Sequence, residues 1–156
     1  IKIISQSFVE NKRDIDHIRK YICEINGDLK SIKLLSKIET NLGVDNFKEI
    51  IRYSDGIIIA RGDLIPECGL INSVDKEFDL LLKVKKYEKE KEVIIATHIL
   101  DNMRKGIIPN INELESIYTF VNLGVTGFLL ASETSIGNYP VKSVEMLKML
   151  INLYKK

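Results

Sequence analysis

Apolar residues gather in five short runs along the chain, separated by longer amphipathic segments. The runs are residues 1–4, 32–35, 56–60, 93–96 and 127–131, and they are rich in isoleucine and valine. They are too short for helices, and β-branched residues favour extended backbone. We therefore predict five strands, each buried on both faces.

The segments between the runs have helical period. Three apolar sets each fall on one helix face: Ile15, Ile18, Ile22 and Ile25, then Ile111, Leu114, Ile117 and Val121, then Val141, Val144, Leu147 and Ile151.

Local signals add detail to these helices. Asp45 is placed to cap a short helix around Phe47, and Pro140 is expected in the first turn of the last helix. The charged stretch 83–91 is typical of the solvated end of a helix.

Strand and helix alternate, which predicts an α/β fold of right-handed βαβ units around a parallel sheet. About five such units fit an open doubly wound sheet as well as most of an eight-stranded barrel, and periodicity alone does not separate the two. A nucleotide-binding Rossmann unit is disfavoured, because no G-x-G-x-x-G follows a run and no P-loop is present.

The composition of the 156 residues, 45% of them hydrophobic, predicts one globular unit. The 23 basic and 22 acidic residues form no basic block, and no apolar run is long enough to span a bilayer, so neither nucleic acid nor membrane is an implied partner. Cys23 and Cys68 lie in no metal-ligand spacing, and we expect them to be incidental buried thiols. The chain starts inside a predicted strand and without Met, which indicates a piece of a longer protein.

Polar clusters follow every run, at the point where each strand should end. They are residues 5–7, 36–39, 61–63, 97–98 and 131–134. Parallel α/β sheets place their active sites at the carboxyl ends of the strands. These clusters are therefore the candidate site.

Two charged pairs stand out. Lys37 and Glu39 are two apart on a predicted strand and should share a face, and Arg61 with Asp63 repeats the arrangement one unit later. Either pair alone fits a structural ion pair. Together, two carboxylates beside a lysine indicate an Mg²⁺ site with a cation left for a phosphate or an enolate. If a helix begins at Gly62, its first N–H groups could bind a carboxylate.

The ordered strings of the chain resemble the barrel motifs of the pyruvate kinase family. They are Ser7-Phe8-Val9, Ser36-Lys37-Ile38-Glu39, residues 55–64 (DGIIIARGDL), residues 95–100 (IATHIL), and Ser132-Glu133-Thr134 followed by Gly137-Asn138-Tyr139-Pro140. The resemblance covers essentially the whole chain.

The resemblance implies that residues 1–156 are part of a TIM (β/α)₈ barrel, spanning strands four to eight. The early strands, a mobile lid domain and a C-terminal domain would lie outside the chain. It implies transfer of a phosphoryl group from phosphoenolpyruvate to ADP, giving pyruvate and ATP in glycolysis. The implied cofactors are Mg²⁺ or Mn²⁺, and K⁺ held by residues outside this chain. The longer protein that contains this chain would be a homo-oligomer. Its expected location is the cytoplasm, and an organelle such as a plastid is the alternative.

The family's roles carry over onto matching residues. By resemblance, Glu39 and Asp63 hold the divalent metal, and Lys37 stabilises the transferring phosphoryl group and the enolate oxygen. The N–H groups of Gly62 and Asp63, with the Thr97 hydroxyl, would hold the substrate carboxylate.

Three further residues have weaker assignments. The enolate carbon would receive its proton through water near Thr97, and Glu133 would orient its neighbours. Ser7 either lines the site or is a buried serine satisfied by backbone, and Arg61 belongs to the Arg-Gly-Asp string.

The chain departs from the family pattern at several places. Ile65-Pro66 replaces a glycine, which puts the start of the following helix in doubt. Pro109 to Glu113 lacks the family's arginine, which puts the usual tetramer in doubt, and Ala131-Ser132 replaces a serine-glycine pair.

Two alternatives to the kinase stay open. The chain could be a degenerate, non-catalytic homologue that acts as a binding or assembly module, or a barrel lyase that forms a pyruvate enolate on Mg²⁺. Retention of Lys37, Glu39, Asp63 and Thr97 together favours the kinase.

Overall fold

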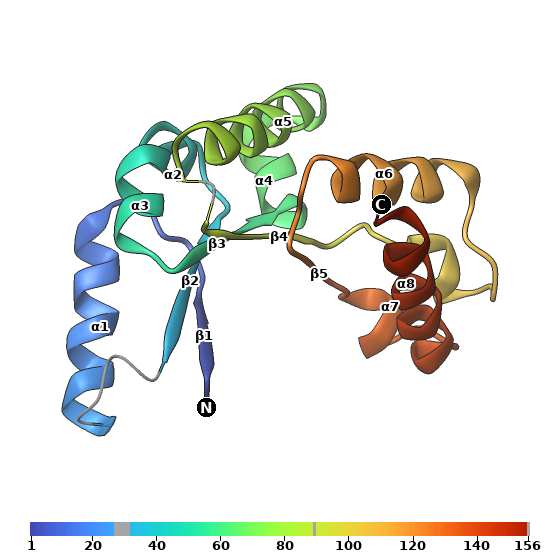
Figure 1. Cartoon of the computed structure of the whole chain (residues 1–156), viewed down its shortest axis with the longest axis horizontal. Coiled ribbons are helices and arrows are strands. Elements are labelled where there is room, and N and C mark those ends of the chain that lie inside the picture. The colour runs from blue at the N-terminus through green and yellow to red at the C-terminus, as the bar shows by residue number, and fades with distance from the viewer. Residues whose placement is uncertain (27–31, 89, 156) are drawn as a thin grey trace. The chain divides into compact units, whose positions relative to one another are not determined.

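The computed structural model describes residues 1–26, 32–88 and 90–155 (Figure 1). Its contacts divide the chain into two compact units, Ile1–Ile94 and Ile95–Lys156. Each unit is described by itself.

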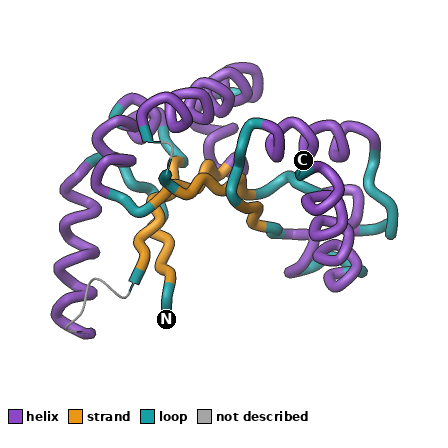
Figure 2. Tube along the Cα trace, viewed as in Figure 1, coloured by secondary structure: helices purple, strands orange, loops and turns teal. Residues whose placement is uncertain are grey.

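The first unit alternates strands and helices (Figures 1 and 2). Its elements are β1 (Ile3–Gln6), α1 (Lys12–Asn26), β2 (Lys33–Ile38), α2 (Asn41–Asp45), α3 (Phe47–Tyr53), β3 (Gly56–Ala60), α4 (Arg61–Cys68), α5 (Leu70–Tyr87) and the start of β4 (Glu92–Ala96). β2 pairs in parallel with β1 and with β3, so that Ser36 lies opposite both Gln6 and Ile57. Helices α1 and α3 lie on the same side of β1 and β2 (Figure 1).

The second unit continues from the end of β4. Its elements are the 3₁₀ helix η1 (Asp101–Arg104), α6 (Ile111–Asn122), β5 (Gly127–Leu129), α7 (Ser132–Ser135) and α8 (Pro140–Tyr154). Ile117 and Phe120 of α6 and Leu147 and Leu150 of α8 are buried.

The strand order is β1-β2-β3-β4-β5, so that every strand lies beside its neighbours in sequence. A doubly wound sheet reverses its strand order at a switch point, whereas a (β/α)₈ barrel adds each strand on the same side. The order therefore decides between the two architectures that periodicity left open: the chain is an α/β partial barrel of five βα units.

Burial differs between central and outer strands. All five residues of β3 are buried, as predicted, and a Cβ at Gly56 would lie 2.6 Å from the Glu92 carbonyl oxygen, so only glycine fits there. The prediction of burial on both faces is wrong for β1, where Ile3 is 51% exposed, and for β5, where Leu129 is 47% exposed. Among the described residues, β1 and β5 stand at the two ends of the strand order.

Two helix starts differ from prediction. Asp45 is the last residue of α2, and the N-cap position of α3 is Asn46 instead. The Thr40 side chain caps α2 by accepting from Gly43 N–H. At α6, Asn110 and Glu113 form a capping box that we did not predict, although Asn followed three residues later by Glu is a known signature of a helix start. Pro140 is the first residue of α8, as expected.

The expectation of buried thiols is wrong. Cys23 is exposed on α1, and Cys68 is half-buried at the end of α4, where its thiol contacts the Asn41 side-chain oxygen at 3.1 Å. Within the described part of the chain, every helix is too short or too polar to cross a membrane.

Candidate active site

Lys37 and Glu39 form an ion pair at the carboxyl end of β2. Lys37 Nζ lies 2.5 Å from Glu39 Oε1, and the Glu39 side chain is fully buried. The period of the strand places both side chains on one face, as predicted. Lys37 Nζ also donates to the Ser7 hydroxyl at 3.1 Å, and Ser7 is exposed rather than buried and satisfied by backbone.

Glu39 also ties β2 to the loop that follows β1. Its Oε2 accepts the backbone N–H of Phe8 at 2.7 Å, and the Val9 N–H donates to the Lys37 carbonyl. Phe8 has a φ of 54°, a left-handed conformation that is uncommon for a bulky residue. Such strain persists only where surrounding contacts determine it, and the charge-assisted bond to Glu39 is one of those contacts.

α4 begins directly at the end of β3. Arg61, Gly62 and Asp63 form its first turn, so the expectation that Arg61 and Asp63 share a strand face is wrong; residues two apart on a helix do not face each other. The helix starts there despite Pro66, and an exposed aspartate in a first turn is favoured by the helix dipole. The start of a helix is a favourable place for a carboxylate, because the helix dipole and the first N–H groups point toward it.

Arg61 finds its partner on α5. Arg61 Nε lies 3.9 Å from Oε1 of Glu77, whose side chain is 5% exposed. Burial raises the pKa of Glu77 to about 6, and the nearby guanidinium opposes that rise. The sequence does not reveal the role of Glu77, because its position on an amphipathic helix gives no sign of which residue lies across from it.

In the second unit, Thr97 and His98 follow β4 with φ values of 65° and 51°. A left-handed backbone costs on the order of 1–3 kcal/mol per residue and is especially rare for a β-branched one. The Thr97 N–H donates to the Leu129 carbonyl at 3.1 Å, and its hydroxyl donates to the Ala96 carbonyl at 2.6 Å. To bind a carboxylate, the hydroxyl must redirect its one hydrogen.

Glu133 lies fully buried in α7. Its Oε1 accepts the backbone N–H groups of Ile99 and Leu100 at 3.2 and 3.0 Å, and its Oε2 accepts that of Ala131 at 2.8 Å. The carboxylate therefore joins the segment after β4 to the segment after β5.

A second contact joins the same two segments. His98 Nδ1 lies 2.6 Å from Asp101 Oδ2, and Asp101 Oδ1 accepts from the Ser132 hydroxyl at 3.4 Å.

The structure brings Ser7, Lys37 and Glu39 together, and Gly62 with Asp63 lies at the end of the next strand of the same unit. The expectation that Thr97 joins Lys37, Glu39 and Asp63 at one end of the sheet stays a prediction.

Two carboxylates are the metal ligands that the sequence predicts. Among the residues described, no group of three or more histidine, cysteine, aspartate or glutamate side chains comes together. Glu39 Oε1 is buried and receives no well-aligned hydrogen bond from the described residues. A hard cation here would use Glu39 and Asp63 and take its other ligands from substrate oxygens or water.

The chain is a segment of a parallel α/β barrel, with a lysine, carboxylates and the start of a helix at the ends of its strands. This arrangement is typical of the barrel domains of enzymes. The family model described as "Pyruvate kinase, barrel domain" matches residues 1–144. The chain belongs to the pyruvate kinase family.

Curated relatives agree with that assignment. The chain is 37% identical to pyruvate kinase of Methanocaldococcus jannaschii over 92% of this chain and 31% of that protein. It is 33% identical to that of Chlamydia muridarum over 100% of this chain and 32% of the other, and 35% identical to that of Mycoplasma pneumoniae over 96% and 29%. The chain thus spans about a third of the length of the curated relatives it matches.

Proposed function

We propose that this chain is part of a pyruvate kinase that transfers a phosphoryl group from phosphoenolpyruvate to ADP. The observation that carries the proposal is the Lys37–Glu39 pair at the end of β2, with its 2.5 Å contact and the Ser7 hydroxyl beside it. The family membership and the matching strings around Asp63 and Thr97 support it.

Lys37 supplies the positive charge for the reaction. As an oxygen of ADP bonds to phosphorus, the bond from phosphorus to the enol oxygen breaks, and negative charge develops on that oxygen. A preorganised ammonium near this oxygen lowers the barrier most when water is excluded. The bond to Ser7 and the pair with Glu39 fix the direction of the lysine side chain.

Glu39 and Asp63 would hold Mg²⁺ or Mn²⁺, whose chemistry is to neutralise phosphate charge and orient the transferring group. Glu39 can do this while bonded to Phe8 N–H, because each carboxylate oxygen has two lone pairs.

The N–H groups of Gly62 and Asp63, in the first turn of α4, would hold the substrate carboxylate. The family resemblance assigns the Thr97 hydroxyl to the same carboxylate. The enolate left after transfer takes a proton at its methylene carbon from water near Thr97, which completes pyruvate.

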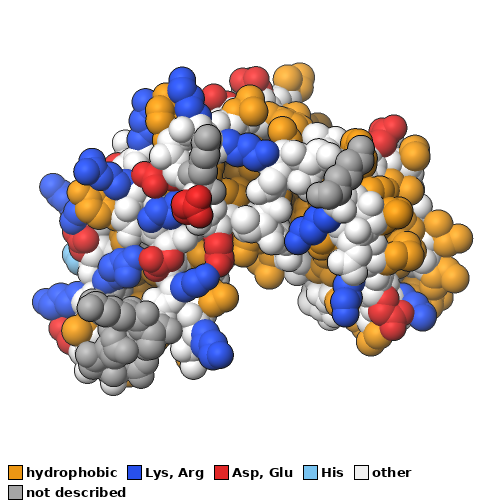
Figure 3. Space-filling model, in the orientation of Figure 1, with side chains coloured by type: hydrophobic (Ala, Val, Ile, Leu, Met, Phe, Trp, Pro, Cys, Tyr) orange, Lys and Arg blue, Asp and Glu red, His pale blue; other side chains and the backbone are white. Residues whose placement is uncertain are grey.

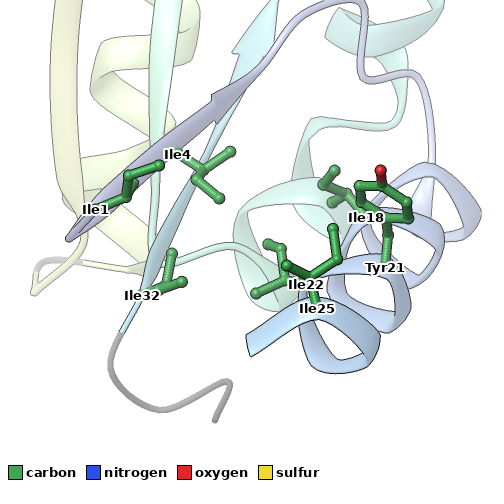
Figure 4. A pocket seen from close by; sticks show the side chains of 7 residues that line it. All are labelled: Ile1, Ile4, Ile18, Tyr21, Ile22, Ile25 and Ile32. Atoms are coloured by element: carbon green, nitrogen blue, oxygen red, sulfur yellow. The ribbon is translucent and has the colours of Figure 1, made fainter. Parts of the chain in front are cut away.

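We also propose that the chain works within a longer barrel. An apolar pocket of about 310 Å³ lies beside β1, between the strand side chains and α1 (Figure 4); Ile1, Ile4, Ile18, Tyr21, Ile22, Ile25 and Ile32 line it. Further strands on the β1 side would cover this surface and supply the K⁺ ligands that the resemblance implies.

A coupled assay tests the proposal. The complete protein that contains this chain is expected to form pyruvate from phosphoenolpyruvate only with ADP, Mg²⁺ and K⁺ all present. Binding of phosphoenolpyruvate without turnover would favour a non-catalytic homologue, and pyruvate formed without ADP would favour a lyase.

A further inference from the structure

The Glu133 carboxylate is the centre of the loop structure at the ends of β4 and β5. It is fully buried, and three backbone N–H groups converge on it, from Ile99, Leu100 and Ala131. A carboxylate has no hydrogen to donate, so both of its oxygens suit these three donors. Glu133 therefore acts as an anchor for backbone.

Two of the three donors directly follow the strained turn. Thr97 and His98 hold positive φ values, and Ile99 and Leu100 come immediately after them. A chain in this conformation relaxes unless its flanks are held. Before the turn, the Thr97 N–H bonds to the Leu129 carbonyl, and after it Glu133 holds two successive N–H groups.

The backbone that directly follows α7 packs closely against its neighbours, and these contacts fix the position of Glu133. A Cβ at Gly137 would lie 2.4 Å from the Glu133 carbonyl oxygen and 3.3 Å from Arg104 Cα, so this close approach requires glycine. The next N–H, of Asn138, donates to the Arg104 carbonyl at 2.9 Å.

We infer that Glu133 is a positioning residue that holds Thr97 in its left-handed conformation and so directs the Thr97 hydroxyl for catalysis. This inference rests on the proposed role of Thr97 toward the substrate carboxylate and the enolate proton. Glu133 acts through backbone and is not itself a proton donor, since its oxygens are occupied as acceptors.

The chain offers a matched control in Glu113. This glutamate is also buried, and its two oxygens accept the backbone N–H groups of Asn102 and Asn110 at 2.7 and 2.8 Å. Glu113 also holds loop backbone in the second unit, but the two residues that donate to it are not next to Thr97 in the sequence. Glu133→Gln and Glu113→Gln therefore make the same chemical change at two similar anchors.

In the complete enzyme, Glu133→Gln turns an NH₂ group toward at least one backbone N–H. We expect kcat to fall about 10–100-fold while the KM for ADP stays within about twofold, because a displacement of a reacting group by about 1 Å has an effect of this size. Glu113→Gln is expected to change kcat by less than about threefold, since it leaves the reacting geometry unchanged.

A double-mutant cycle separates positioning from general loosening. If Glu133 acts through Thr97, then Glu133→Gln should cause little further loss in a Thr97→Ala background. Equal losses of kcat in both backgrounds, or a kcat for Glu133→Gln as near normal as that of Glu113→Gln, would overturn the inference. If the wild-type enzyme forms no pyruvate, the proposed function is wrong, and the positioning role of Glu133 is wrong with it.

Amide hydrogen exchange of the wild type needs no variant and covers the case in which Glu133→Gln does not fold. Ile99 and Leu100 amides should exchange slowly, as expected for donors to a buried carboxylate. Fast exchange at both amides would show that the anchor does not hold the turn.

Discussion

At the level of single residues, buried carboxylates organise this chain by accepting bonds from backbone. Glu39 binds the N–H of Phe8, Glu133 binds three N–H groups, and Glu113 closes a capping box. Hydrogen bonds from backbone N–H groups offset the cost of burying a carboxylate, so each of these residues holds the loop that it contacts.

Lys37 offers the sharpest test at this scale. Lys37→Ala in the complete enzyme should lower kcat by roughly 100-fold or more, because it deletes preorganised positive charge where negative charge develops. The measurement is steady-state pyruvate formation at saturating substrates.

Lys33 is the control. It lies at the opposite end of β2 from Lys37, where it forms an ion pair with Glu92. Lys33→Ala should leave kcat near the wild-type value. Near-normal kinetics of Lys37→Ala would point to the non-catalytic homologue instead.

At the level of elements, helix α5 places the carboxyl group of Glu77 close to Arg61 of α4, but the two side chains pair poorly. Glu77 is buried, and its Oε1 has only the distant Arg61 guanidinium, with no hydrogen bond from the described residues. Its raised pKa means that ionising it opposes folding.

The expected effect on stability has a definite sign. Because the folded pKa of about 6 lies above the ordinary value of 4.5, the contribution of Glu77 is fully present below pH 4.5 and is lost as pH rises through 6. The loss is about 2 kcal/mol of unfolding free energy.

Glu77→Gln should therefore flatten the pH dependence of the melting temperature between pH 4.5 and 7.5. Thermal unfolding of the complete protein at several pH values measures this, with the exposed Glu115→Gln as control. Parallel curves for wild type and Glu77→Gln would contradict the account.

At the level of the whole molecule, much apolar surface is exposed. Besides the pocket beside β1, helix α8 exposes Val141, Val144, Met149 and Leu153, and Figure 3 shows hydrophobic side chains gathered over the second unit. Contiguous exposed apolar surface and unpaired strand edges favour association.

The isolated 156-residue chain should therefore have no pyruvate kinase activity and should associate or aggregate. The proposed site needs the walls and the lid that other parts of the protein would provide. Phosphoryl transfer and solution mass, both measured on the isolated chain, test this expectation. Robust turnover by a soluble monomer would show that the site is self-sufficient.

The sequence by itself determined the alternation of strands and helices and the polar clusters at the strand ends. β3 and the shared face of Lys37 and Glu39 follow from local periodicity, which needs no knowledge of distant neighbours. Pro140 at the start of α8 follows from the geometry of its own ring.

Only the tertiary structure decided which partners these residues meet. The strand order that selects the barrel, the Arg61–Glu77 pair and the burial of each strand depend on which elements pack together. The donors to Glu39 and Glu133 are backbone N–H groups, which every residue except proline carries. Such donors leave no mark in the sequence, so their positions become visible only when folding brings distant segments of the chain into contact.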